Sequence, residues 1–219
     1  MSPTSLLLIP TDAERQWAGQ LLDSLAPDIE VELCGFGSIV AGVRTAQLIA
    51  RYRPRRIWLV GIAGALDADL DLGTAYEFDQ VACYGIGVGC GSQFQSASEM
   101  GWHQWPGVGP KSDSTTITDC LTLDTNRQLS SERPSQLLTV CSASASAEQV
   151  AWHKQKFPQA AAEDMEGFSV ATACLLAQVP LRIIRGLSNT AGDRDHRNWQ
   201  SAMAMRSAVE LCSSQLEQL

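Results

Sequence analysis

Apolar and polar positions along this chain fall into two alternating patterns. Short continuous apolar runs, such as residues 6–9 and 57–66, are typical of strands that are buried on both faces of a sheet. Between these runs, apolar residues recur at helical spacing, most clearly over residues 39–52, where Pro54 is expected to end the helix. Strands that alternate with helices predict an α/β fold with a central mixed or parallel sheet and helices on both of its faces.

The same patterns predict the other elements. We expect strands at residues 6–9, 30–34, 57–66, 74–86, 137–141, 160–164 and 181–187, and helices at residues 12–25, 39–52, 146–156, 166–178 and 196–218. Residues 87–135 show little periodicity, which is typical of loops over a site or of an insertion. Because no linker, repeat or low-complexity tract interrupts the chain, residues 1–219 are predicted to form a single domain around a central mixed sheet.

Composition and charge narrow the class of protein. The formal net charge is −8, so the chain offers no basic face for a nucleic acid or an anionic membrane surface. No apolar run approaches the roughly 18 residues of a membrane span, and no basic leader precedes the first apolar run. The seven cysteines form no CxxC pair and are interpreted as small buried residues. We therefore expect a cytoplasmic protein without a nucleic-acid or membrane partner.

Polar residues gather where four of the predicted strands end. The four clusters are Thr11, Asp12 and Glu14; the turn at residues 61–66; Met165 and Glu166; and Arg185, Ser188 and Asn189. Each cluster also has a purely structural explanation. Asp12 suits a helix cap, and Glu166 suits a first helical turn with Arg185 as its salt-bridge partner. Because α/β sheets bind ligands at the carboxyl ends of their strands, the four clusters together favour a ligand site.

Three other motifs carry less information. The GFG turn at residues 35–37 lacks the third glycine of a dinucleotide fingerprint, which is Val40, so it is interpreted as a tight turn that can offer N–H groups to an anion. The histidines and the serines of residues 142–146 form no nucleophile motif. The stretch "GDRDHRNW" at residues 192–199 is interpreted as the solvated, charged start of the last helix.

Three stretches together resemble the purine nucleoside phosphorylase and nucleosidase superfamily. They are "GFGSIVAG" at residues 35–42, "VGIAGALDADLDLGTAYEFDQV" at residues 60–81 and "AAAEDMEGFSVATACLLAQVPLRIIRGLSN" at residues 160–189. Within the superfamily, the stretches at residues 89–101 and 188–199 are most similar to futalosine hydrolases of menaquinone biosynthesis, and next to methylthioadenosine/S-adenosylhomocysteine nucleosidases. The resemblance implies hydrolysis of the N-glycosidic bond of a purine nucleoside, with no metal or organic cofactor.

The resemblance also assigns roles to individual residues. It implies that Glu14 activates water and that Glu166 holds the ribose hydroxyls, with Met165 under the sugar ring. Asn189, oriented by Ser188, would then read the base.

Two supporting residues and a homodimer are implied as well. Arg185 is expected to tie its strand end to neighbouring carboxylates, and Asp12 is the fallback acid if Glu14 is not the base. Homodimers are expected because sites in this superfamily are often completed by a neighbouring subunit.

Two positions depart from the nucleosidase pattern. Asn189 stands where methylthioadenosine/S-adenosylhomocysteine nucleosidases have Asp. A side-chain amide can donate to N7 and O6 of hypoxanthine, but it can also pair with adenine, so hypoxanthine is favoured mainly by resemblance. Ile62 replaces a small polar residue, which removes a possible hydrogen bond to the nucleophile and disfavours phosphate.

Other activities stay open at this point. Arg15 in "PTDAER" could bind phosphate and make the protein a phosphorylase, although the adjacent Glu14 would repel that anion. A non-catalytic nucleoside-binding protein is the second alternative. The 5′ substituent of the nucleoside is undetermined, and we expect the loop at residues 87–110, with Phe94, Trp102 and Trp105, to contact it.

Overall fold

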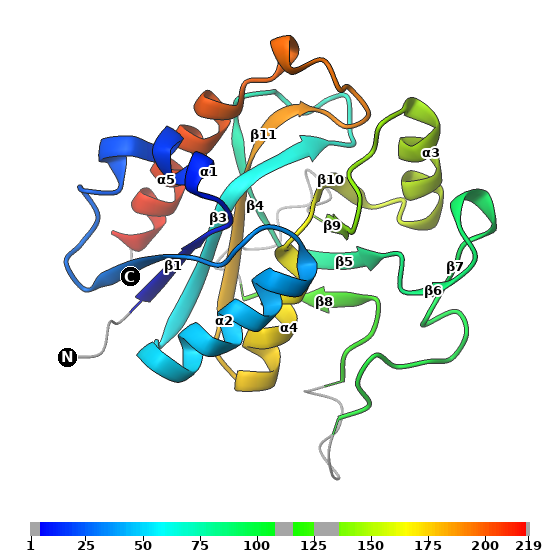
Figure 1. Ribbon diagram of the computed structural model, residues 1–219, viewed down its shortest axis with the longest axis horizontal. Coiled ribbons are helices and arrows are strands. Elements are labelled where there is room, and N and C mark those ends of the chain that lie inside the picture. The colour runs from blue at the N-terminus through cyan, green and yellow to red at the C-terminus, as the bar shows by residue number, and fades with distance from the viewer. Residues whose placement is uncertain (1–4, 108–115, 125–135, 218–219) are drawn as a thin grey trace.

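Strand β3 (Arg56–Ala65) lies at the centre of a mixed sheet in the computed structural model, which describes residues 5–107, 116–124 and 136–217 (Figure 1). Strand β11 (Leu181–Thr190) runs parallel to β3 along one edge. Along the other edge, β1 (Ser5–Ile9) pairs in parallel with the first part of β3, and β10 (Ala160–Asp164) pairs antiparallel with its last residues. The predicted α/β fold with a central mixed sheet is confirmed.

The remaining strands extend this sheet on both sides or form a separate hairpin. β2 (Ile29–Leu33) pairs with β1, and β4 (Ala75–Phe78) pairs with β11. On the other side of the sheet, β10 is followed in order by β9 (Gln136–Val140), β5 (Gln80–Tyr84) and β8 (Cys120–Thr122). The separate hairpin consists of β6 (Gly87–Val88) and β7 (Gln95–Ser96).

Helices cover both faces of the sheet, as Figure 1 shows. They are α1 (Asp12–Ala18), α2 (Ser38–Tyr52), α3 (Ala147–Lys156), α4 (Gly167–Ala177) and α5 (Ser201–Leu216), with short 3-10 turns at Gly19–Leu21, Gly91–Gln93 and His196–Asn198. No helix of the described ranges is long and apolar enough to cross a membrane.

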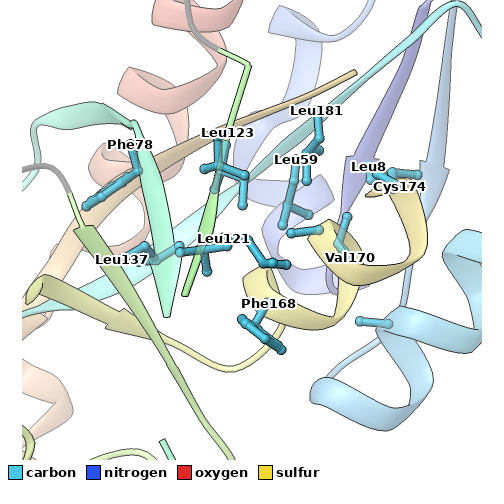
Figure 2. Close-up of a cluster of buried hydrophobic side chains, with 14 of the residues drawn as sticks. Leu8, Leu59, Phe78, Leu121, Leu123, Leu137, Phe168, Val170, Cys174 and Leu181 are labelled. Carbon is cyan, nitrogen blue, oxygen red and sulfur yellow. The ribbon is translucent and has the colours of Figure 1, made fainter. Parts of the chain in front are cut away.

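Alternation of side chains along β1 divides the core between the two faces. Leu7 and Ile9 pack with α1 and α5, whereas Leu6 and Leu8 belong to the cluster that includes α2 and α4. Figure 2 shows part of this second cluster, where side chains of α4 such as Val170 gather against the strands. Burial on both faces explains why these strands appear in the sequence as continuous apolar runs.

Several predicted boundaries were wrong. The helix predicted over residues 12–25 ends at Ala18, because Gly19 turns the chain with a positive φ of 55°. Thr11 caps this helix in place of Asp12, and its hydroxyl accepts a hydrogen bond from the backbone N–H of Glu14. The strand predicted over residues 74–86 is two strands, β4 and β5, which pair with different neighbours.

The C-terminal elements also differ from the prediction. β11 continues to Thr190, so Ser188 and Asn189 lie within the strand and not after it, because β3 continues beside them to Ala65. The last helix begins at Ser201 and not at residue 196, since a 3-10 turn and an extended residue precede it. Within residues 87–135, where the sequence shows little periodicity, residues 108–115 and 125–135 lie outside the described part of the chain.

Candidate active site

The four polar clusters that the sequence places near strand ends meet in one cavity of about 330 Å³. Their members on its wall are Thr11, Glu14, Ile62, Ala63, Gly64, Met165, Glu166, Ser188 and Asn189. The parallel strands β1, β3 and β11 bring three of the clusters to the same end of the sheet, and antiparallel β10 delivers the fourth. This position agrees with the general rule that α/β sheets bind ligands at the carboxyl ends of their strands.

A gap in the pairing of β3 forms the floor of the cavity. β1 pairs with β3 only as far as Leu59, and β10 begins to pair with it at Gly64. Between these points the backbone N–H of Ile62 donates to Glu14 Oε1 at 3.0 Å. The contribution of Ile62 to Glu14 is therefore a backbone donor, which does not depend on a polar side chain at this position.

Glu14 is held with its carboxylate inside the cavity wall. Glu14 is only 5% exposed, and its Oε2 accepts a hydrogen bond of 2.6 Å from the Thr11 hydroxyl. A Cβ atom on Gly61 would lie 2.8 Å from Glu14 Oε1 and 2.0 Å from Arg185 Nη1, so only glycine permits this approach. Because a carboxylate oxygen can accept more than one hydrogen bond, Glu14 keeps capacity for a water molecule.

Asp12 and Arg15 lie outside the cavity lining, contrary to the supporting role expected for Asp12. They form an ion pair of 2.6 Å on the exposed side of α1, and Asp12 also accepts from Gln16 at 2.7 Å. These hydrogen bonds lower the pKa of Asp12, with Arg15 as the larger cause. Neither side chain is placed to act as the base or to bind phosphate in this cavity.

A fully buried arginine connects Glu166 to a second carboxylate, Asp164. Arg185 donates from Nε and Nη2 to Asp164 Oδ2 at 3.1 and 2.5 Å, and from Nη2 to Glu166 Oε2 at 3.4 Å. Arg185 thus pairs with Glu166, as expected if the two residues form a salt bridge, but the main partner of Arg185 is Asp164. The sequence reasoning missed Asp164, although an acidic residue at the end of an apolar strand was a visible signal.

Glu166 has an unusual environment for a carboxyl group. Burial raises its pKa to about 7, with a further contribution from Asp164, against the opposing effect of Arg185. Glu166 Oε1 accepts from the backbone N–H of Gly37 at 2.9 Å, and Gly37 holds a φ of +79° that favours glycine. The GFG turn therefore does offer an N–H group to an anion, and that anion is a side chain of the protein itself.

A β-bulge brings Ser188 and Asn189 together on one side of the cavity. The register between β11 and β3 shifts between Leu187 and Asn189, so Ser188 is the extra residue. Neighbouring residues of a regular strand face opposite sides, whereas a bulge lets both of these line the cavity. Ser188 Oγ donates to Asn189 Oδ1 at 2.8 Å, and Asn189 Nδ2 donates to the carbonyl of Thr190 at 2.8 Å. One proton of the amide nitrogen is left for a ligand.

A buried polar network that the sequence reasoning missed lies next to this part of the cavity. Glu163 accepts from the backbone N–H of Ser144 at 2.8 Å and from its hydroxyl at 2.7 Å. His153 Nδ1 lies 3.1 Å from both Ser144 Oγ and Glu163 Oε2. Ser144 and Glu163 both line the cavity. The acidic end of the AAAED run was the sequence signal for Glu163, while Ser144 in a Ser/Ala tract gave none.

The aromatic residues around the cavity differ from those expected. Phe94 was predicted to bind substrate, but it is buried against Tyr84, with ring centroids 4.5 Å apart, and does not line the cavity. Trp102 and Trp105 are also absent from its described lining. The aromatic lining comes from Trp17, Phe36 and Trp199.

The turn that precedes α5 lines the cavity as well, although the sequence suggested a merely solvated helix start. Arg194, His196 and Trp199 of this turn all belong to the cavity wall. An arginine and a tryptophan just beyond a site strand were the signal that could have found it.

Comparison with known proteins gives this cavity a context. A 5′-methylthioadenosine/S-adenosylhomocysteine nucleosidase of Tolumonas auensis is 24% identical over 200 residues, which cover 88% of this chain and 82% of that protein. Among solved structures, the corresponding nucleosidase of Neisseria meningitidis with methylthio-immucillin-A superposes with a TM-score of 0.76 at 17% identity, covering 99% of this chain and 100% of that one.

Futalosine hydrolase of Helicobacter pylori superposes equally well. Its TM-score is 0.76 at 16% identity, over 100% of this chain and 99% of that one. Two of these similar proteins are nucleosidases by name and the third is a hydrolase by name, and the two structures share the fold of this chain. The sequence profile of the Phosphorylase superfamily matches residues 27–217, which is most of the chain. The protein described by this sequence and this cavity therefore belongs to the Phosphorylase superfamily.

Proposed function

We propose that the protein hydrolyses the N-glycosidic bond of a purine nucleoside. One observation carries the proposal: two buried carboxylates, Glu14 and Glu166, line the same cavity as the amide of Asn189. Cleavage of this bond passes through a positively charged sugar, and it needs an acceptor for a proton of water, a grip on the ribose and a donor to the leaving base. The three residues supply these functions from three different elements.

Glu14 would act as the general base. Its carboxylate is oriented by Thr11 and by the N–H of Ile62, so it can accept a proton from a water molecule without changing its position. Glu166 would accept hydrogen bonds from the ribose hydroxyls while Met165 packs against the sugar ring. The negative charges of both carboxylates stabilise the positive charge that develops on the sugar in the transition state.

Asn189 would stabilise the leaving base. Its free Nδ2 proton can be donated to N7 of a purine, and Ser188 fixes the amide in the orientation that presents this proton. We favour futalosine as the substrate, which would release hypoxanthine in a step of menaquinone biosynthesis. Methylthioadenosine or S-adenosylhomocysteine is the alternative substrate, which the names of the curated relatives favour.

Water is favoured over phosphate as the nucleophile. The cavity lining contains four carboxylates, namely Glu14, Glu163, Asp164 and Glu166, and Arg185 offsets only part of their charge, so the remaining charge disfavours an inorganic anion. Arg15, the residue that phosphorolysis would require, is engaged with Asp12 on the outer side of α1.

A second subunit would complete the cavity on its open side. Phe36 lines the cavity but is 64% exposed, and Ile39, Val40 and Val43 of α2 continue from it as exposed apolar side chains. We propose that a second copy of the chain covers this surface in a homodimer. Sedimentation should give the mass of a dimer, and Ile39→Glu should give monomers, whereas Leu176→Glu, at another exposed apolar position, should not. A monomeric wild-type protein would contradict the proposal.

Product analysis tests the proposed reaction. The protein is incubated with futalosine, inosine, adenosine and methylthioadenosine, with and without phosphate, and the free base and sugar are identified. Hypoxanthine and free sugar from futalosine, independent of phosphate, would support the proposal. A sugar 1-phosphate would make the protein a phosphorylase. Binding of nucleosides without release of any base would make it a non-catalytic binding protein.

A further inference from the structure

Glu163 and Asn189 face the cavity from the two sides of one glycine. Both residues pair with Gly64 of β3, Glu163 from β10 and Asn189 from β11. Because neighbouring strands of a sheet lie roughly 5 Å apart, the backbones of Glu163 and Asn189 are separated by about 10 Å. Both side chains line the cavity, so a flat base that lies over Gly64 can contact a carboxylate along one edge and an amide along the other.

The Glu163 carboxylate is held in one orientation by its neighbours. Its Oε1 accepts from the backbone N–H of Ser144 at 2.8 Å, and its Oε2 accepts from the Ser144 hydroxyl at 2.7 Å. His153 Nδ1 lies 3.1 Å from Oε2, and because an Nδ1 without a proton would direct a lone pair at this oxygen, the tautomer with a proton on Nδ1 fits the arrangement. A carboxylate accepts about four hydrogen bonds, so Oε1 keeps one position for a ligand.

Aromatic packing holds the histidine that orients this carboxylate. His153 lies on α3 and is buried, and its ring centroid lies 4.4 Å from that of Tyr84 on β5. The ring of Tyr84 lies in turn 4.5 Å from that of Phe94. His153 is not part of the described cavity lining, so it can act on a ligand only through Glu163.

The two candidate bases differ at N1. Hypoxanthine carries a hydrogen on N1 and donates there, whereas N1 of adenine carries a lone pair and accepts. An ionised carboxylate can only accept hydrogen bonds, so it attracts the N1–H of hypoxanthine and repels N1 of adenine. The amide of Asn189 can pair with either base, so it does not make this choice by itself.

We propose that Glu163 determines the preference of the site for a 6-oxopurine by accepting a hydrogen bond from the N1–H of hypoxanthine. Ser144 and His153 are positioning residues, which present the remaining lone pair of Glu163 Oε1 to the base. Asn189 contacts the opposite edge of the base at N7. This inference rests on the proposed nucleosidase function and identifies the residue that discriminates between its two candidate bases.

Binding measurements in the Glu14→Gln background test the inference, because this variant should bind a nucleoside without consuming it. The ligands are 5′-methylthioinosine and 5′-methylthioadenosine, which share one 5′ substituent and differ only in the base. Calorimetry should give a Kd about tenfold or more lower for the inosine. Adding Glu163→Ala should bring the ratio of the two Kd values to about one. Adding Glu163→Gln, which has the same shape and keeps an acceptor oxygen without the charge, should reduce the ratio only in part.

A third ligand tests the contact at N1 with Glu163 left in place. The 1-deaza form of 5′-methylthioadenosine has a C–H group instead of N1, so it lacks the lone pair that Glu163 repels. Its Kd should be about fivefold or more lower than that of 5′-methylthioadenosine. Glu163→Ala should remove this gain, and equal Kd values with Glu163 in place would overturn the inference.

Glu148→Ala is the matched control. It also removes a carboxylate, but Glu148 lies exposed in the first turn of α3 and is not part of the described cavity lining. The base preference should therefore be unchanged in this variant.

Two variants of His153 test its positioning role. Leucine removes the donor at Nδ1, so His153→Leu should lower the ratio of the two Kd values. Asparagine places an amide N–H close to the position of Nδ1, so His153→Asn should restore the ratio. A residue with a merely structural role would change the free energy of unfolding without changing the base preference. An unchanged ratio in His153→Leu would overturn the positioning role.

The outcome for the two bases decides the main inference. Equal Kd values for the inosine and the adenosine, or a preference for the inosine that survives Glu163→Ala, would overturn it. Tighter binding of the adenosine that is lost in Glu163→Ala would place the carboxylate at the 6-amino group and would overturn it as well.

The inference and the proposed function can fail separately. A base preference that depends on Glu163, in a protein that releases no base from any nucleoside, would keep the specificity residue and overturn the nucleosidase. Release of base by the wild-type protein, with a base preference that does not depend on Glu163, would keep the nucleosidase and overturn the inference.

Discussion

Glu163 and Asn189 lie on opposite sides of Gly64, because both pair with this residue of β3, one from β10 and the other from β11. Both side chains line the cavity. Glu163 is engaged with Ser144 and His153, while Asn189 keeps one free amide proton. This side of the cavity thus has a fixed acidic wall and one amide donor, and in the proposed function recognition of the base should depend on Asn189.

Asn189→Asp should shift the preference of the protein from 6-oxopurine toward adenine nucleosides. A carboxyl group can carry the proton that N7 of adenine requires, whereas it loses the amide donor for N7 and O6 of hypoxanthine. The ratio of kcat/KM for methylthioadenosine to that for methylthioinosine should rise about tenfold or more. The same ratio in both proteins would mean that Asn189 does not read the base.

Glu14→Gln should reduce kcat by roughly 100- to 10,000-fold, because the amide cannot accept a proton from water. Binding of nucleoside, measured by calorimetry, should persist. Asp12→Asn is the control, since Asp12 lies only two residues away but faces the outer side of α1 with Arg15. It should keep nearly all activity, and a comparable loss in both variants would argue against Glu14 as the base.

Asp164→Asn and Glu166→Gln should separate stability from activity. Asp164 holds the buried guanidinium of Arg185 with two hydrogen bonds, so its replacement should lower the free energy of unfolding by roughly 3–5 kcal/mol. Glu166→Gln leaves that pair intact and should abolish activity with little loss of stability. Chemical denaturation measures both, and a larger destabilisation by Glu166→Gln would make Glu166 mainly a salt-bridge partner.

The pKa of Glu166, about 7, predicts how activity depends on pH. The proposed role needs the ionised carboxylate, so kcat/KM should fall as the pH drops below about 7. A profile that stays flat from pH 8 to pH 5.5 would contradict this role for Glu166.

The raised pKa of Glu166 also predicts that the stability of the protein changes with pH in the opposite direction to its activity. Because the folded-state pKa lies above the ordinary value of 4.5, the stability contributed by this group is present below pH 4.5 and lost as the pH rises through 7. The stability of the wild-type protein relative to Glu166→Gln should therefore decrease over this range. Denaturation curves of both proteins at several pH values measure the difference.

Strand ends and helix periods made much of the fold predictable. The runs at residues 6–9 and 57–66 were strands because strands buried on both faces must be apolar throughout. The residues at the strand ends identified part of the cavity wall, since a buried sheet tolerates polar residues only where the strands emerge. Boundaries that depend on pairing with a distant strand, such as the extension of β11 to Thr190, could not be predicted in this way.

The sequence by itself determined the α/β architecture and the superfamily, and it identified several polar residues of the cavity wall, because these follow from local periodicity and short motifs. Only the tertiary structure decided which neighbours share a site. The bulge at Ser188, the partnership of Asp164 with Arg185 and the position of Arg194 at the rim each depend on contacts between distant segments. Such contacts are set by how strands pair and helices pack, which a single stretch of sequence does not encode.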